Sequence, residues 1–206
     1  MADYYIIRSS QYAQMSTRFY EEYLAAKKMY DRVDEIFVPS ENPVLNYSYK
    51  TRYLQQADDN AIASVVFQAL AVEAYTNLWG MWLLGEEEFY ANYDSKKRLS
   101  TPNKLVTLAE KMGKEFPTEL KDRIERLFQK RNSFVHQKPK AYHFEVKPYD
   151  YKNPAASFDD IDAFIHDLSY AEEDLAAEMQ IFADLQKCVQ TLRGAECELI
   201  EEFGRG

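Results

Sequence analysis

The sequence predicts an all-α fold, an antiparallel helical bundle with long helices towards its N- and C-terminal ends. Only six Gly and seven Pro occur in 206 residues, so long segments are free of helix breakers. Within those segments apolar residues recur every three or four positions, the pattern of a buried helix face. Hydrophobic residues make up 46% of the chain and aromatic residues 15%, which excludes a disordered chain.

The first long helix is expected over residues 9–37 and the second over residues 49–84, with Pro39 and Pro43 between them. The middle of the second helix, residues 65–72, is apolar nearly all round, which predicts a place at the centre of the bundle. A short acidic segment follows at residues 86–93. The stripe of the first helix consists of Tyr12, Met15, Phe19, Tyr23, Ala26, Tyr30, Val33 and Phe37.

Two shorter helices are expected next. Ser100 or Thr101 can cap the third, with Pro102 in its first turn and an end near Gly113. The fourth begins at about residues 117–119 and ends near residue 137, because Pro139 disfavours helical geometry at the preceding residue. Its apolar positions are Leu120, Ile124, Leu127, Phe128, Phe134 and Val135.

The rest of the chain is expected to hold a proline-containing loop at residues 138–157, with a short strand at 142–146, and a last long helix over residues 158–202. We therefore expect one helical domain over residues 1–206. Its core spans about residues 49–140, and the long helices at 9–37 and 158–202 flank that core.

Several features favour a cytoplasmic protein without membrane contact. The N-terminal residues lack the basic start and apolar run of a signal peptide. The most apolar window, residues 61–84, contains Gln68, Glu73 and Asn77, which favours a core helix over a membrane span. Cys188 and Cys197 lie on opposite faces of one predicted helix, so they cannot bridge each other there.

The charge distribution permits a local anion site. The net charge is −9, but residues 96–140 hold thirteen Lys or Arg against five Asp or Glu, a balance of +8. The remaining residues carry −17. This basic segment suits a partner with phosphate groups. The alternative is a chance cluster of lysines and arginines on a solvated helix face.

The hexapeptide Arg131-Asn132-Ser133-Phe134-Val135-His136 lies in that basic segment, flanked by Lys130 and Lys138. Arg131 follows Leu127 by four residues and therefore lies on the apolar stripe, where a charge is costly unless it is paired or borders a cleft. An ion pair with Glu73 is one expectation for it. His136 shares a face with Asn132, but about 140° separates it from Arg131 on an ideal helix. A shared site would need a groove or a second subunit.

The hexapeptide resembles the R-x4-6-H signature of the HEPN superfamily in its R-N-x-x-x-H form. Arg131, Asn132 and His136 occupy the three specified positions of that form. The preceding apolar helix with Glu73 and Asn77 is also similar to that family, and the resemblance covers roughly residues 60–140. A Tyr that toxin members often carry two residues after the His is Lys138 here.

The resemblance implies a metal-independent endoribonuclease that acts as a homodimer on RNA, with no cofactor. His136 would be general acid or base at the ribose 2′-hydroxyl or the leaving oxygen, and Arg131 would bind the scissile phosphate. Asn132 would orient His136 or the phosphate, with Glu73, Asn77, Lys130 and Lys138 in support. A toxin–antitoxin or phage-defence setting, with an antitoxin or other protein partner, is the expected context.

Other chemistry has weaker sequence support. Asp162 and His166 are spaced like metal ligands, but the residue three before His166 is Ala163 where a di-iron bundle needs Glu, so no metal site is expected. His143 with Glu145 is another weak pair. Two further hypotheses remain: a non-catalytic HEPN-like module that binds RNA, nucleotide or a protein, and an unrelated helical scaffold with an accidental motif.

Overall fold

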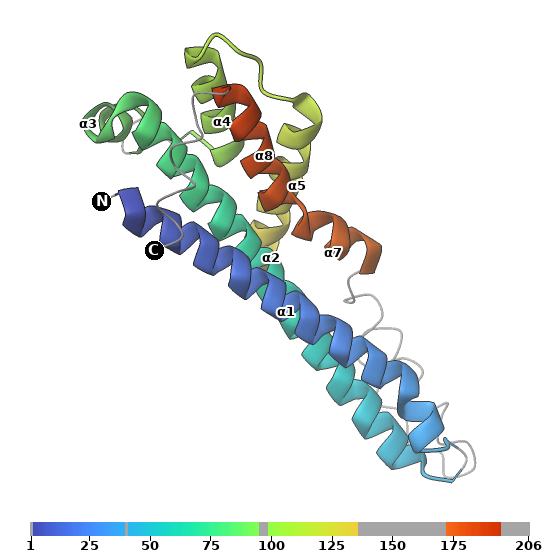
Figure 1. Cartoon of the computed structure of the whole chain (residues 1–206). Coiled ribbons are helices and arrows are strands. Elements are labelled where there is room, and N and C mark those ends of the chain that lie inside the picture. Colours follow the sequence, from blue (N-terminus) through green and yellow to red (C-terminus); the bar gives the residue numbers. More distant parts are fainter. Residues whose placement is uncertain (1, 40, 95–98, 136–171, 195–206) are drawn as a thin grey trace.

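The computed structural model describes residues 2–39, 41–94, 99–135 and 172–194 (Figure 1). All regular secondary structure in these ranges is helical, and they contain no strand, as expected for an all-α protein. The elements are α1 (Ala2–Ile36), α2 (Pro43–Leu84), α3 (Glu86–Phe89), the π-helical η1 (Tyr90–Asp94), α4 (Thr101–Lys111), α5 (Thr118–Val135), α7 (Glu172–Met179) and α8 (Ile181–Arg193).

Helices α1 and α2 form a long antiparallel hairpin, and α4, α5, α7 and α8 pack beside the C-terminal half of α2 (Figure 1). We call residues 27–56, the turn-proximal part of the hairpin, the arm. The other described residues form the body. The arm extends beyond α4, α5, α7 and α8, so only α1 and α2 stabilise each other there among the described elements (Figure 1).

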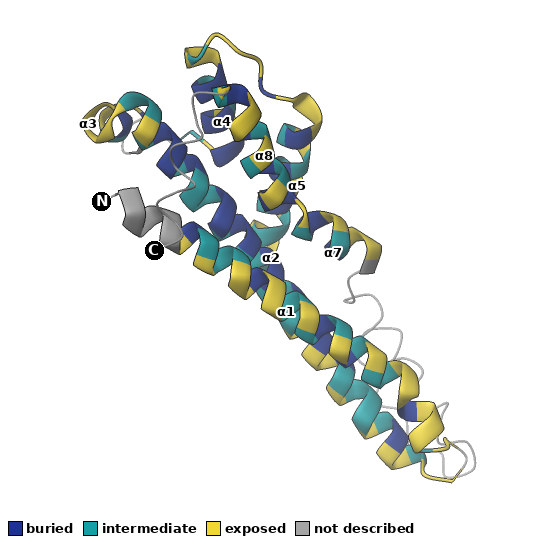
Figure 2. Cartoon of the chain, in the orientation of Figure 1, coloured by how far each residue is buried: buried dark blue, intermediate teal, exposed yellow. Residues whose placement is uncertain are grey.

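The main core lies in the body and surrounds the middle of α2 (Figure 2). This location confirms the prediction from the apolar run at residues 65–72. Burial of these side chains removes apolar surface from water, which is the dominant favourable contribution to folding. The core includes Val65, Val72, Leu105, Leu108, Ile124, Leu127, Leu175, Leu185 and Val189.

The two long N-terminal helices begin earlier than predicted. Helix α1 begins at Ala2, and α2 begins at Pro43 with Asn42 at the N-cap. Pro43 occupies the first helical turn, where its missing N–H costs nothing and its fixed φ suits a helix. The proline therefore begins α2 and does not keep the chain non-helical up to residue 49. The predicted bounds of α4 agree with the structure, with Ser100 at its N-cap and Gly113 after its end at φ +69°.

The prediction of one continuous helix over residues 158–202 is wrong. Gln180 separates α7 from α8, and α8 ends at Arg193 before Gly194, whose φ is +72°. Gln68 of α2 donates hydrogen bonds from Nε2 to the carbonyls of Glu178 (3.1 Å) and Met179 (3.0 Å). This contact holds the junction of the two helices against the centre of α2. Cys188 lies in α8 with a free thiol, whereas the predicted loop and strand at 138–157 and Cys197 lie outside the described residues.

Helix α2 is long and apolar enough to cross a membrane by length and composition alone. Its most apolar 18-residue window has a mean hydropathy of 1.3, and 44% of that window is buried inside the protein. The core helix of a soluble protein passes the same test. Four other helices cover the C-terminal half of α2 in the described structure, which agrees with a core helix (Figure 1).

Candidate functional site

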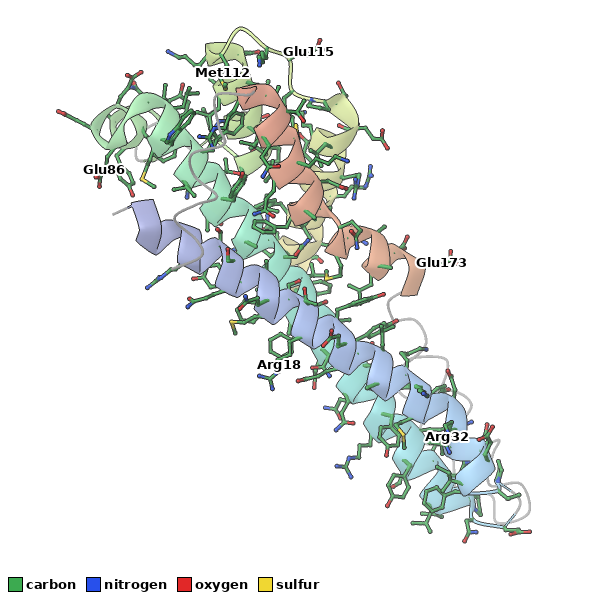
Figure 3. The ribbon with its side chains drawn as sticks, viewed as in Figure 1. Arg18, Arg32, Glu86, Met112, Glu115 and Glu173 are labelled. Atoms are coloured by element: carbon green, nitrogen blue, oxygen red, sulfur yellow. The ribbon has the colours of Figure 1, made fainter. Side chains whose placement is uncertain are left out.

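A polar cleft of about 440 Å³ lies between α2, the N-terminal turn of α4 and the C-terminal half of α5. Met112 and Glu115 mark the connection between α4 and α5, at the opposite ends of these helices from the cleft (Figure 3). The cleft is lined by Glu73, Leu99, Ser100, Thr101, Pro102, Lys104, Glu125, Phe128, Gln129, Arg131 and Asn132.

Arg131 is half-buried at the last turn of α5, beyond the buried Leu120, Ile124 and Leu127. Its Nη1 donates to Oδ1 of the exposed Asn132 at 3.1 Å. Its Nε is buried and has no hydrogen-bond partner in the described structure. A buried donor without a partner costs about 1–3 kcal/mol, so the Nε position suits an acceptor brought by a ligand.

The expected ion pair between Arg131 and Glu73 is not formed, although both residues line the same cleft. The carboxylate that pairs at this end of α5 is Glu178 of α7, and its partner is Lys130. Arg131 instead uses its neighbour Asn132. The spacing of Arg131 from Leu127 predicted that Arg131 lies on the apolar face of α5. It could not predict that Glu178 of α7 approaches this end of α5.

Lys130 does not line the cleft, because its ammonium forms the ion pair with Glu178. Glu178 is buried, and burial raises the pKa of its carboxyl, although the hydrogen bond from Lys130 opposes that rise. Its Oε2 has no hydrogen-bond partner in the described part of the chain. Lys130 is therefore occupied in holding α5 to α7, a structural role that differs from the supporting role in the site expected for it.

Lys104 is a cleft residue that the sequence reasoning missed. Its side chain is only 7% exposed, and its Nζ donates to Oδ1 of Asn77 at 3.2 Å. The same Nζ lies 5.8 Å from the ring centroid of Phe89. Lys104 precedes Leu108 by four residues on the buried face of α4, the same signal that singled out Arg131. Asn77 therefore acts on the cleft through Lys104, without lining it.

The N-terminal turn of α4 completes the lining. Thr101 is 7% exposed, and its hydroxyl makes no hydrogen bond in the described structure. The N-cap Ser100 makes no side-chain capping bond either. The first backbone bond of α4 runs from the Lys104 N–H to the Ser100 carbonyl at 2.9 Å, which leaves the N–H groups of Thr101 and Asn103 without a backbone partner in the described residues.

The cleft carries charges of both signs. Lys104 and Arg131 contribute cations, and Glu73 and Glu125 contribute carboxylates. Glu125 is compensated by Lys121, whose Nζ lies 2.8 Å from its Oε1, and this hydrogen bond raises the pKa of Lys121. Glu73 forms no ion pair with any described residue. Helices α4 and α5 therefore bring hydrogen-bond donors and positive charge to the cleft, and α2 brings the carboxylate of Glu73.

The remaining predicted site residues, His136 and Lys138, lie outside the described residues, as do His143, Glu145, Asp162 and His166. His136 immediately follows Val135, the last residue of α5, in the sequence. Among the described residues no group of three His, Cys, Asp or Glu side chains is placed to hold a metal ion.

The fold and the cleft define an all-α protein with a polar, donor-rich site between three helices. Comparisons with family models, with curated proteins and with solved structures find no match for this chain. The function is therefore inferred from the residues of the cleft and from the hexapeptide that begins at Arg131 in the last turn of α5.

Proposed function

We propose that this chain is a metal-independent endoribonuclease of HEPN type that cleaves RNA held in the cleft between α2, α4 and α5. The observation that carries the proposal is the position of Arg131 and Asn132. These first two residues of the R-N-x-x-x-H pattern both line the cleft, and the buried Nε of Arg131 has no partner among described residues. A guanidinium with an unused donor suits the non-bridging oxygens of a phosphate.

The proposed reaction uses the ribose 2′-hydroxyl as the nucleophile. The 2′-oxygen loses its proton and attacks phosphorus, the bond from phosphorus to the 5′-oxygen breaks, and that oxygen takes up a proton. His136 serves as the general base or the general acid in these transfers. Arg131 stabilises the added negative charge on the phosphate, and Asn132 orients the guanidinium through the 3.1 Å contact. The products are a 2′,3′-cyclic phosphate and a free 5′-hydroxyl.

The proposal includes assembly and setting. Arg131 and His136 are five residues apart, about 140° around an ideal helix, so two subunits that bring their α5 ends together would complete the site. A homodimer in the cytoplasm, controlled by an antitoxin or another protein partner in a toxin–antitoxin or phage-defence system, is the context that the family resemblance suggests.

A cleavage assay in EDTA tests the enzyme. Purified protein is incubated with single-stranded RNA and with DNA of the same sequence, and the 3′ ends of the products are identified. We expect RNA cleavage with cyclic phosphate ends, no DNA cleavage, and a loss of at least about 100-fold in Arg131→Ala and His136→Ala. Arg126→Ala is the matched control, since Arg126 is exposed on α5 and does not line the cleft.

Three outcomes would contradict the enzyme. Cleavage that needs a divalent metal would assign different chemistry, and equal losses in the Arg126 and Arg131 variants would separate the activity from the cleft. Tight RNA binding without cleavage would assign the chain to the non-catalytic modules. Thermal melts of each variant distinguish a lost site from a lost fold.

A further inference from the structure

We propose that the N-terminal turn of α4, together with Lys104, binds a second phosphodiester of the RNA, next to the one held by Arg131. This subsite rests on the proposed ribonuclease function and names how its substrate is held. The feature behind it is the part of the cleft formed by Ser100, Thr101 and Lys104, which the R-N-x-x-x-H pattern does not include.

The first observation is the unused donors at the start of α4. The N–H groups of Thr101 and Asn103 have no backbone partner in the described residues, and Ser100 makes no side-chain cap. The N-terminus of an eleven-residue helix also carries the positive end of the helix dipole. Donors and dipole together favour an oxyanion.

The second, independent observation is the Thr101 side chain. It is more than nine-tenths buried, lines the cleft, and has a hydroxyl without a hydrogen-bond partner in the part of the chain that the structure describes. The hydroxyl oxygen is not among the enclosed polar atoms of the described residues, so it is open to the cleft and can donate to a ligand there. An anion oxygen in the cleft would accept from this hydroxyl and from the Thr101 N–H.

The third observation is Lys104. The residue is more than nine-tenths buried and lines the same cleft, and its ammonium contacts the neutral amide of Asn77 without an ion pair to any described carboxylate. A buried cation is stabilised when an anion compensates it. Glu73 lines the same cleft, so a bound phosphate must outweigh the repulsion from that carboxylate, and Lys104 and the α4 turn supply the opposing positive charge.

The size of the cleft favours more than one phosphate. Its volume of about 440 Å³ lies in the range of about 300–1,000 Å³ typical of sites for small organic ligands. Arg131 and Asn132 come from α5, whereas Thr101 and Lys104 come from α4, so the two sets of donors approach the cleft from different helices. Consecutive phosphodiesters of one RNA strand fit this division.

The experiment uses trinucleotides with one ribose, so that only one linkage can be cleaved. The other linkage, placed on the 5′ or the 3′ side, is either a phosphodiester or a neutral methylphosphonate. In the wild-type chain we expect the methylphosphonate to raise KM about tenfold on one of the two sides, since charge-assisted hydrogen bonds are lost. In Thr101→Val and Lys104→Met the same replacement is expected to change KM by less than about twofold, because the contact is already missing.

Lys111→Met is the matched control, since Lys111 is exposed at the other end of α4 and should respond like the wild type. A wild-type KM that ignores the methylphosphonate on both sides would overturn the subsite, and so would an equal response in the Thr101 and Lys104 variants. The comparison of the two substrates with the wild-type chain needs no variant. It therefore tests the subsite even if a variant fails to fold.

Failure of the ribonuclease proposal can be recognised separately. If the wild-type chain cleaves no RNA, calorimetric titration with inorganic phosphate replaces the kinetic test. Binding that is lost in Thr101→Val and Lys104→Met but kept in Lys111→Met would support an oxyanion site without ribonuclease activity. Equal binding in all four proteins, or none in the wild type, would overturn the site.

Discussion

The arm and the body bury their apolar side chains in different ways. In the body, α2 is surrounded by helices, and the core brings together side chains from α1, α2, α4, α5, α7 and α8. In the arm, α1 and α2 have only each other among the described elements, and the buried Val33 and Leu54 lie outside the main core. Helix α2 is therefore surrounded by other helices in the body but packs only against α1 in the arm, among the described elements.

The arm shows how two helices are held together outside the main core. The arm uses paired aromatic rings and polar contacts, such as Phe37 stacked on Tyr49 with ring centroids 4.6 Å apart. Lys50 pairs with Asp34 at 2.8 Å. Its end leaves apolar side chains exposed, because two helices can cover only one face of each other. These exposed residues are Ile36, Val38, Val44 and Leu45.

The largest expected difference concerns two buried leucines. Leu127→Ala in the body should lower the free energy of unfolding by about 2–5 kcal/mol, since Leu127 is fully buried in the main core and leaves a cavity there. Leu54→Ala in the arm should cost less, because the neighbouring helices can move into the space. Chemical denaturation of both variants measures the difference.

Hydrogen exchange shows whether the two parts open separately. Leu54→Ala is expected to speed exchange in the arm and leave the amides of α5 protected. Equal destabilisation by both substitutions, with faster exchange throughout, would mean that the arm and the body unfold as one unit.

A smaller effect is expected at the buried Asn46, near the end of the arm. Its Nδ2 donates to Oδ1 of Asp34 at 2.8 Å and to the carbonyl of Phe37 at 2.7 Å. Asn46→Ala removes both bonds and should cost about 1–3 kcal/mol, confined to the turn-proximal end of the hairpin. Amide exchange in residues 33–37 is the measurement, and Gln55→Ala, an exposed change in the same part of α2, is the control. Unchanged exchange in Asn46→Ala would show that these bonds do not hold the arm.

The body was more predictable than the junctions between elements. Helices α4 and α5 follow from local signals: Pro102 in a first turn, a 3.6-residue apolar period and Gly113 after an end. The start of α2 was misjudged because Pro43 interrupts a helix in its interior but suits its first turn. The break at Gln180 depends on Gln68, which lies more than 100 residues earlier, so no local pattern could indicate it.

The candidate site shows the same division between local and tertiary information. Arg131 lies on the apolar stripe of α5 and lines the cleft, as its spacing from Leu127 indicated. Lys104 has the same spacing from Leu108 in α4 and is the second cation of the cleft. The hydrogen-bond and ion-pair partners of these side chains could not be predicted from the spacing of apolar residues. Arg131 pairs with Asn132 and Lys130 with Glu178, because side-chain geometry and the approach of α7 decide between several nearby groups.

The smallest expected effect is a pH dependence at Asp58, where the arm meets the body. Burial is the main cause that raises the pKa of Asp58 from 3.8 to about 6, with the charge of Asp59 adding to it and Lys27 opposing it. Between these values the folded chain keeps a proton that the unfolded chain has lost. The stability contributed by Asp58 is therefore full below about pH 4 and is lost as the pH rises through about 6.

Asp58→Asn replaces the carboxylate by a neutral group of the same shape. The variant should melt at a temperature a few degrees above that of the wild type at pH 7.5 and close to that of the wild type at pH 4, and the gap should open between these limits. Asp31→Asn, which removes a charge from an exposed position on α1, should not reproduce that pattern. A gap that is constant with pH would show that Asp58 titrates alike in the folded and unfolded chains. The face of α2 that carries Asp58 would then be as well solvated as the arm, although Ala57 next to it is buried in the main core.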